Sequence, residues 1–103
     1  MDEPAPPARP LVLLLDPRDT SAIALVPIRA GTRVEVRRGD ANVYLVAAAL
    51  IPFGHKIALV PVAAGGPVIK YGEVIGFATC EIRPGQHVHV HNVRSDRARV
   101  RDA

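Results

Sequence analysis

The chain has 103 residues, a formal net charge of +3 and 49% hydrophobic residues, which predicts one domain with a modest core. Its single cysteine excludes an internal disulfide and is typical of a reducing compartment. The charge excess comes from arginines, four of them in the last ten residues. No aromatic residues interleave with these arginines, so we expect no nucleic-acid partner.

The composition favours an all-β fold with short strands, many turns and little helix. Valine, isoleucine, leucine and alanine dominate the apolar residues, and 8 glycines and 10 prolines interrupt them. The one cysteine, Cys80, lies in an apolar run and is predicted to be a buried structural thiol.

The two ends of the chain differ from its middle. Residues 1–10 hold four prolines and no basic signal region, which predicts a flexible leader. Residues 11–93 form the predicted domain, and residues 94–103 a charged, flexible tail. The apolar runs Leu11–Leu15 and Val43–Phe53 are too short to span a bilayer, so we expect a cytoplasmic protein with no membrane partner.

Four segments in the first half of the chain are candidates for regular structure. The wholly apolar run Leu11–Leu15 predicts a buried strand. Ser21–Val26 predicts a second strand, with a single helical turn over Ala22–Leu25 as the alternative. Thr32–Arg38 alternates, which predicts a strand with its two valines on one face. Asn42–Leu50 is rich in alanine and fits either a strand or a short helix.

An internal repeat predicts the scaffold. Residues 21–36 match residues 55–70 at an offset of 34 residues, and a shorter third copy covers residues 82–90. Each copy reads as a strand, a glycine turn and an alternating strand, because glycine permits the positive φ that such a turn requires. The aligned glycines are Gly31, Gly65 and Gly85, and the aligned valines are Val34, Val68 and Val88.

The positions that differ between the copies include the polar ones. The second copy has His55, Lys56 and Lys70 where the first copy has a serine, an alanine and a valine. The third copy has His89 and His91 where the first has a glutamate and an arginine. Folding of the unit does not demand these polar groups, so we expect them to serve a site.

Three alternating histidines follow the last glycine turn. If His87–Asn92 is a strand, its two valines face the core and His87, His89 and His91 share the other face. Imidazole is a common ligand of divalent iron and zinc. At a rise of about 3.3 Å per residue, the first and last histidines lie about 13 Å apart. One ion would therefore bind a neighbouring pair, either His89 with His91 or His87 with His89.

Three motifs in a fixed order carry a family resemblance. They are Ile51–Leu59, Val68–Gly76 and Gly85–Asn92, and they closely resemble the N-terminal domain of altronate and galactarate dehydratases. The resemblance covers residues 11–93 and implies a SAF-like domain with a β-clip fold. The small subunit of sulfolactate sulfo-lyase, which eliminates sulfite, is similar.

The resemblance implies a hydro-lyase subunit that removes water from a sugar acid such as altronate or galactarate. It also implies a divalent metal, Fe²⁺ first and Mn²⁺ or Zn²⁺ as alternatives, shared with a large catalytic subunit. We expect the chain to be inactive without that partner, and a homo-oligomer is compatible with the sequence. The alternatives are a sulfolactate sulfo-lyase subunit and a free-standing SAF-like module that binds a small carboxylate or a protein.

The residues expected to form the site fall into three roles. The expected catalytic residues are His55, Lys56, Lys70 and Tyr71. The expected substrate-binding residues are Lys56, Lys70, Gly72, His87 and Asn92. The expected metal ligands are His89 and His91, and Glu73 is expected to be exposed. We expect the catalytic residues and metal ligands to gather on one side of the fold, where their positive charge would bind an anion.

Overall fold

The computed structural model describes residues 10–95 and contains no helix in that range. Within it, therefore, no helix could cross a membrane. The described residues form antiparallel strands joined by turns, which confirms the all-β prediction. The strands are β1 (Val12–Leu13), β2 (Ser21–Ala24), β3 (Arg33–Arg38), β4 (Ala41–Val46), β5 (Lys56–Ala58), β6 (Pro67–Lys70), β7 (Glu73–Ala78), β8 (His87–Val88) and β9 (Val93–Ser95).

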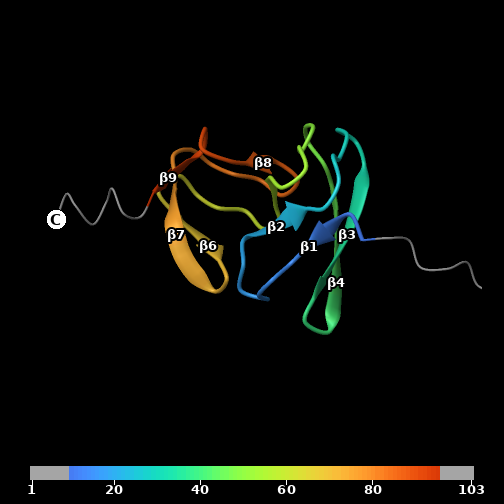
Figure 1. The fold of residues 1–103 in the computed structure, drawn as a ribbon. Helices are drawn as coiled ribbons and strands as arrows, with labels where there is room; N and C mark the ends of the chain where they lie inside the picture. The colour runs from blue at the N-terminus through green and yellow to red at the C-terminus, as the bar shows by residue number, and fades with distance from the viewer. Residues whose placement is uncertain (1–9, 96–103) are drawn as a thin grey trace, which may run out of the picture.

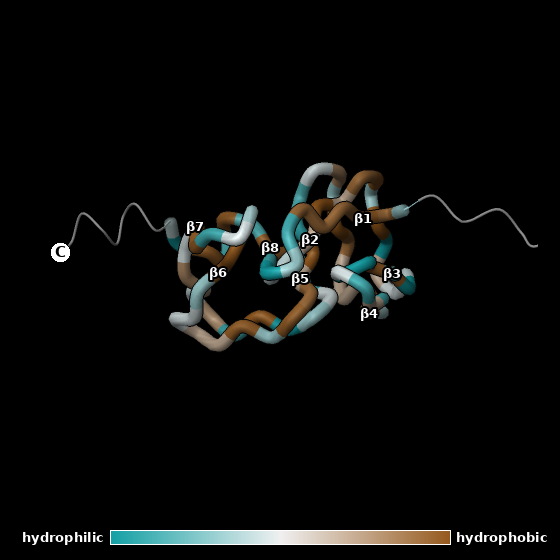
Figure 2. Tube along the Cα trace, turned by 90° about the horizontal axis from the view of Figure 1, so that it is seen from below, coloured by the Kyte–Doolittle hydropathy of each residue, from teal (hydrophilic) through white to brown (hydrophobic). Residues whose placement is uncertain are grey.

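The strands make three small sheets. A four-stranded sheet in the order β1-β2-β5-β8 lies between the β3–β4 hairpin and the β6-β7-β9 sheet (Figure 1). The view from below shows the same order, with the hairpin and the three-stranded sheet at opposite ends (Figure 2). One apolar cluster packs β1, β2, β3 and β4 together, and a second one packs β6, β7 and β8. The β5–β8 pair lies where the two clusters meet.

Four turns of identical hydrogen bonding build this scaffold. Each turn starts at a buried apolar residue and contains a glycine of positive φ three residues later. The glycine N–H donates to an alanine carbonyl, and the N–H of that alanine donates to the carbonyl of the residue after the glycine. The turn–alanine pairs are 28–32 with Ala47, 51–55 with Ala24, 62–66 with Ala78, and 82–86 with Ala58. All four alanines are buried, so each turn is fixed against the core.

The turns also pair with one another. Ile28 bridges to Ile51, and Val62 bridges to Ile82, so the first two turns and the last two turns form matching halves. Each turn leads directly into a strand whose second residue is buried; these residues are Val34, Ile57, Val68 and Val88. The predicted turns at Gly31, Gly65 and Gly85 are confirmed by their φ values of 86°, 81° and 90°.

The second turn, residues 51–55, was not predicted as a copy of the repeat. Its central residues are proline and phenylalanine, which do not resemble the other copies. The defining hydrogen bonds involve only the backbone, so the central side chains are free to differ. The turn ends at His55, directly before β5, and thereby places the first histidine at the end of a strand.

The open alternatives in the first half resolve in favour of strands. Ser21–Ala24 is β2, and the helical turn is absent; Ala41–Val46 is β4. The prediction that Leu11–Leu15 forms a buried strand is wrong in extent. Only Val12–Leu13 is a strand, and Leu13 and Leu15 are 45% and 42% exposed. Because β1 is a short edge strand, alternate side chains point away from the core.

Two further predictions are corrected. The folded region extends beyond residue 93, because Val93–Ser95 pairs with β7 as strand β9. Its polar side chains are compatible with an edge strand, where the ladder uses only backbone groups. Cys80 is exposed, because it lies in the bend after β7. The rest of the predicted leader and tail, residues 1–9 and 96–103, lies outside the described residues.

The turn between β6 and β7 contains a tyrosine in a strained backbone conformation. Tyr71 and Gly72 are the two loop residues, and both have positive φ, 55° and 75°, which defines a type I′ turn. Asparagine or glycine is favoured at the first position of such a turn, and a tyrosine there costs about 1–2 kcal/mol. Tyr71 is also 59% exposed, so packing does not explain its presence.

Replacing Gly85 by alanine should destabilise the protein more than the same change at Gly31. Both residues have positive φ, which costs an alanine about 1–2 kcal/mol. A Cβ at Gly31 would meet nothing within 4 Å, whereas a Cβ at Gly85 would overlap the Val46 carbonyl. We expect Gly85→Ala to lose about 1–3 kcal/mol more, measured by urea unfolding. Equal losses would show that the turn yields freely at that contact.

Replacing Tyr71 by asparagine should stabilise the protein. Asparagine tolerates a positive φ, so relief of strain should raise the free energy of unfolding by about 0.5–1 kcal/mol. Tyr44→Asn is the matched control, because Tyr44 is similarly exposed, 54% against 59%, but lies in strand β4. The control should lose stability, since asparagine is disfavoured in strands. A destabilised Tyr71→Asn variant would contradict the strain argument.

Candidate functional site

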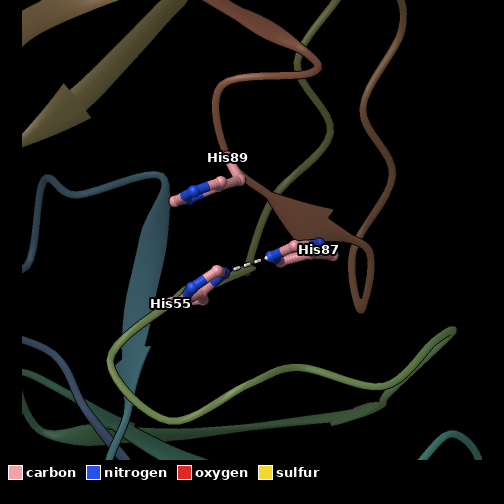
Figure 3. Close-up of side chains that lie close together, drawn as sticks. All are labelled: His55, His87 and His89. Atoms are coloured by element: carbon pink, nitrogen blue, oxygen red, sulfur yellow. Dashed lines mark hydrogen bonds between the residues drawn. The ribbon is translucent and has the colours of Figure 1, made fainter.

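Pairing of β5 with β8 brings together histidines that are distant in sequence. The register places Lys56 opposite Val88 and Ile57 opposite His87. Continued by one residue, it places His55 opposite His89, as a cross-strand pair on the same face as His87. Figure 3 shows these three histidines around the end of the pair; His55 lies directly before β5, His87 is on β8, and His89 directly follows β8.

The three rings lie close together and nearly parallel. The ring centroids of His55 and His89 are 4.0 Å apart, and those of His55 and His87 are 5.0 Å apart. A hydrogen bond of 2.8 Å joins His55 Nδ1 to His87 Nε2 (Figure 3). His55 and His87 are half-buried, and one nitrogen from each ring lies within 4.8 Å of the other two.

This cluster suits a divalent metal ion after a small rearrangement. Two nitrogens about 2.0–2.1 Å from a tetrahedral ion are about 3.3 Å apart, so the 2.8 Å hydrogen bond would open on binding. An ion lies in the plane of each imidazole that ligates it, so stacked rings must also turn about χ2, a soft torsion in histidine. Burial and the neighbouring histidines lower the pKa of His87, which favours the neutral, ligating form.

The strand containing these histidines is shorter than predicted. It ends at Val88, and residues 89–92 form a turn. The Asn92 side chain accepts a hydrogen bond from the N–H of His89 and donates one to the His87 carbonyl. Val90, which was expected to face the core, is therefore 81% exposed. Asn92 is buried, and its amide group is occupied by this turn.

His91 remains beside the cluster although it lies in the turn. Its ring centroid is 5.1 Å from that of His87, with the rings tilted by 36°. It lies outside the set of three whose nitrogens lie within 4.8 Å of one another. The group whose nitrogens lie close enough together to hold one ion is therefore His55, His87 and His89, and the pair of His89 with His91 stays a prediction. Sequence reasoning missed this set because it depends on the pairing of β5 with β8.

Lys56 lies near the histidine cluster, and Lys70 lies near Lys56. Burial first, and the charge of Lys70 second, lower the pKa of Lys56. Lys56 in turn contributes to the lowered pKa of His89, after burial and His55. The Lys70 ammonium lies 5.1 Å from the Tyr71 ring centroid. Lys56 is therefore within electrostatic reach of both His89 and Lys70, and Lys70 lies beside Tyr71.

The composition makes this concentration specific. The whole sequence has four histidines and two lysines, and all six belong to this group. Among residues 10–95, the two ion pairs both involve arginine, so neither Lys56 nor Lys70 is paired with a carboxylate. Glu73 is exposed, as predicted. We name the six residues and Tyr71 the cationic site.

A small cavity adjoins the cationic site. Its volume is about 250 Å³; Lys56 and His89 line its polar part, and Ile75, Val88 and Val90 are among its apolar walls. A larger cavity of about 920 Å³ lies between β1 and the β3–β4 hairpin, and no histidine or lysine lines it. Cavity size alone therefore does not locate the chemistry in this fold.

Comparison with known proteins agrees with the fold and the motifs. Residues 10–96 match the family described as altronate/galactarate dehydratase SAF domain. The chain is 41% identical over 78 residues to altronate dehydratase of Escherichia coli K12, covering 76% of this chain and 15% of that protein. It is 34% identical over 79 residues to galactarate dehydratase (L-threo-forming) of the same organism, covering 77% and 14%.

A smaller relative matches over most of its length. The chain is 44% identical over 62 residues to the alpha subunit of (2R)-sulfolactate sulfo-lyase from Paracoccus pantotrophus, covering 60% of this chain and 92% of that subunit. The chain thus spans only a small part of the dehydratases that it matches, but nearly all of this subunit. The family match covers most of the chain, so it belongs to the SAF domain family of the altronate and galactarate dehydratases.

Proposed function

We propose that this chain is the SAF component of a metal-dependent lyase that eliminates water from a sugar acid such as altronate or galactarate. The observation that supports it best is the gathering of every histidine and lysine of the chain in the cationic site. The relatives named as dehydratases supply the reaction class. The cytoplasm is the proposed location, because the single cysteine is typical of a reducing compartment.

Elimination needs three kinds of group. A base removes the proton α to the carboxylate, the C–H electron pair forms the double bond, and the β-hydroxyl takes a proton and leaves as water. Cations must hold the carboxylate and the negative charge that develops on it. Lys70 is proposed to hold the carboxylate, and half-buried Lys56 to remove the proton. Tyr71 lies beside Lys70 and can donate a hydrogen bond from its hydroxyl group.

The histidine cluster is proposed to bind the divalent metal. Imidazole nitrogens suit Fe²⁺ and Zn²⁺, and His55, His87 and His89 supply three of them. A bound ion would supply Lewis-acid stabilisation of the substrate oxygens. Our proposal assigns Asn92 to shaping the turn that carries His89, in place of direct substrate contact.

A larger catalytic chain is proposed to complete the site. No carboxylate contributes to the shifted pKa values of Lys56, His87 or His89, so carboxylate groups at this site would come from outside the described residues. The match covers only 15% of the altronate dehydratase, so most of that protein has no counterpart in this chain.

Sulfite elimination from sulfolactate is the second candidate. The observation that favours it is the 92% coverage of the Paracoccus sulfo-lyase subunit. The same cationic site would serve, because sulfolactate also carries a carboxylate and its elimination also starts with removal of a proton. The two candidates differ only in the leaving group, so assays with galactarate, altronate and sulfolactate separate them.

Metal binding tests the histidine assignment directly. The full chain, loaded anaerobically with Fe²⁺ or with Zn²⁺ at pH 7.5, should bind one ion per chain by elemental analysis and calorimetry. His55→Ala, His87→Ala and His89→Ala should each weaken binding about tenfold or more, because each removes a ligand. His91→Ala should weaken it much less. If His91→Ala weakens binding as strongly as His89→Ala, the ligand set is the pair first predicted from the sequence.

Turnover tests the role of the lysines. The chain should show no activity alone, and activity should appear with its large catalytic chain. Lys70→Ala should then lower kcat/KM about 100-fold, since it removes a charge that stabilises the transition state. Arg83→Ala is the matched control, because Arg83 is a cation in an exposed ion pair with Glu81. Equal activity of the two variants would remove Lys70 from the site, and full turnover by the isolated chain would remove the need for a partner.

A further inference from the structure

The loop before β2 is hydrogen-bonded to the turn that contains Tyr71 and follows Lys70. The Gly72 N–H donates a hydrogen bond of 2.8 Å to Asp19 Oδ1. The neighbouring Thr20 takes both backbone groups of Ile69: its hydroxyl accepts from the Ile69 N–H, and its N–H donates to the Ile69 carbonyl. The backbone is therefore held on both sides of Lys70 and Tyr71, by residues about fifty positions earlier.

The strand itself is altered at this point. The register of β6 with β7 shifts between Val68 and Ile69, which is a bulge. A bulge leaves one residue unpaired and bends the strand that contains it. Here the extra residue lies on β7, between Val74 and Gly76, and Ile69 on the facing strand bonds to Thr20 through both of its backbone groups.

Asp19 is buried to an unusual degree for a carboxylate. It is 2% exposed, and it accepts its hydrogen bond from the loop residue next to the strained Tyr71. Arg18 contributes no hydrogen bond to it; Arg18 pairs instead with Asp16, and the pair packs against Gly72. A Cβ on Gly72 would overlap the Arg18 guanidinium and lie 2.8 Å from Asp16 Oδ2. The loop can therefore pack against this turn only if residue 72 is a glycine.

We infer that Asp19 is a positioning residue, which holds the strained Tyr71–Gly72 turn so that Lys70 and Tyr71 face the ligand of the cationic site. The inference rests on the proposed function, because it assigns a geometric support to two of its residues. A purely structural turn would have no use for a tyrosine of positive φ that is largely exposed. A turn that must present the Tyr71 hydroxyl group beside Lys70 does require a tyrosine at this position.

The experiment compares two variants of Asp19 in the full-length chain loaded with Zn²⁺, with galactarate as the probe. Asp19→Asn keeps an oxygen that can accept from the Gly72 N–H, whereas Asp19→Ala has none. Binding is followed by the amide NMR signals of Lys70 and Tyr71, and the zinc affinity is measured in parallel. Asp16→Ala is the control, because Asp16 belongs to the same loop but pairs with Arg18.

We expect Asp19→Ala to bind galactarate at least tenfold more weakly, to lose protection of the Gly72 amide from exchange, and to keep its zinc affinity. Asp19→Asn should bind within about threefold of the wild type, and Asp16→Ala should keep the protection of the Gly72 amide. Gly72→Ala disturbs the same hydrogen bond at its donor residue, because the added Cβ would overlap the Arg18 guanidinium. This variant serves as the test if Asp19→Ala does not fold. It should show the same loss of binding at unchanged zinc affinity.

Two results would overturn the inference, and they are distinguishable. If the wild type binds galactarate and the variant that breaks the hydrogen bond binds it equally well, Asp19 has only a structural role and the proposed function stands. If the wild type binds zinc but none of galactarate, altronate and sulfolactate, either alone or with its large catalytic chain, the ligand class in the proposed function is wrong and this inference is lost with it.

Discussion

The two hydrogen bonds between a glycine turn and a buried alanine are the constraint on which the rest of this fold depends. They occur four times, and each time they fix the direction in which the following strand leaves the turn. A side chain larger than alanine would have to fit under the turn, and a residue other than glycine would strain it. Most of the short strands have at least one end fixed in this way, because β3, β5, β6 and β8 start at a turn and β2, β4, β5 and β7 end at or directly before one of the alanines.

The same constraint leaves the side chains of the turns free to carry chemistry. The hydrogen bonds involve backbone groups alone, so the position after the glycine can hold Thr32, His55, Gly66 or Gln86 without changing the turn. In one copy the residue after the glycine is His55, and the β5–β8 register, continued by one residue, places His89 opposite it. The site is thus a variation on a repeated scaffold, at the boundary between two apolar clusters.

Much of this could be predicted from the sequence, because repeats and glycine turns are local signals. The all-β fold and three of the four turns follow from them. The histidine set could not be predicted, since His55 and His87 meet through strand pairing across 32 residues. The exposure of Val90 was missed for another reason. The Asn92 side chain takes the backbone groups that would have continued the strand, and alternation alone does not reveal such competition.

The choice of lysine in this site has a chemical reason. The chain uses arginine eleven times and lysine only at Lys56 and Lys70. A guanidinium stays protonated at any physiological pH, whereas burial and a neighbouring cation can bring an ammonium within reach of its neutral form. Lys56 has both influences, and its pKa is lowered accordingly. A site that only had to attract an anion would work with arginine, so the lowered pKa of Lys56 supports the proposal that this residue removes the proton.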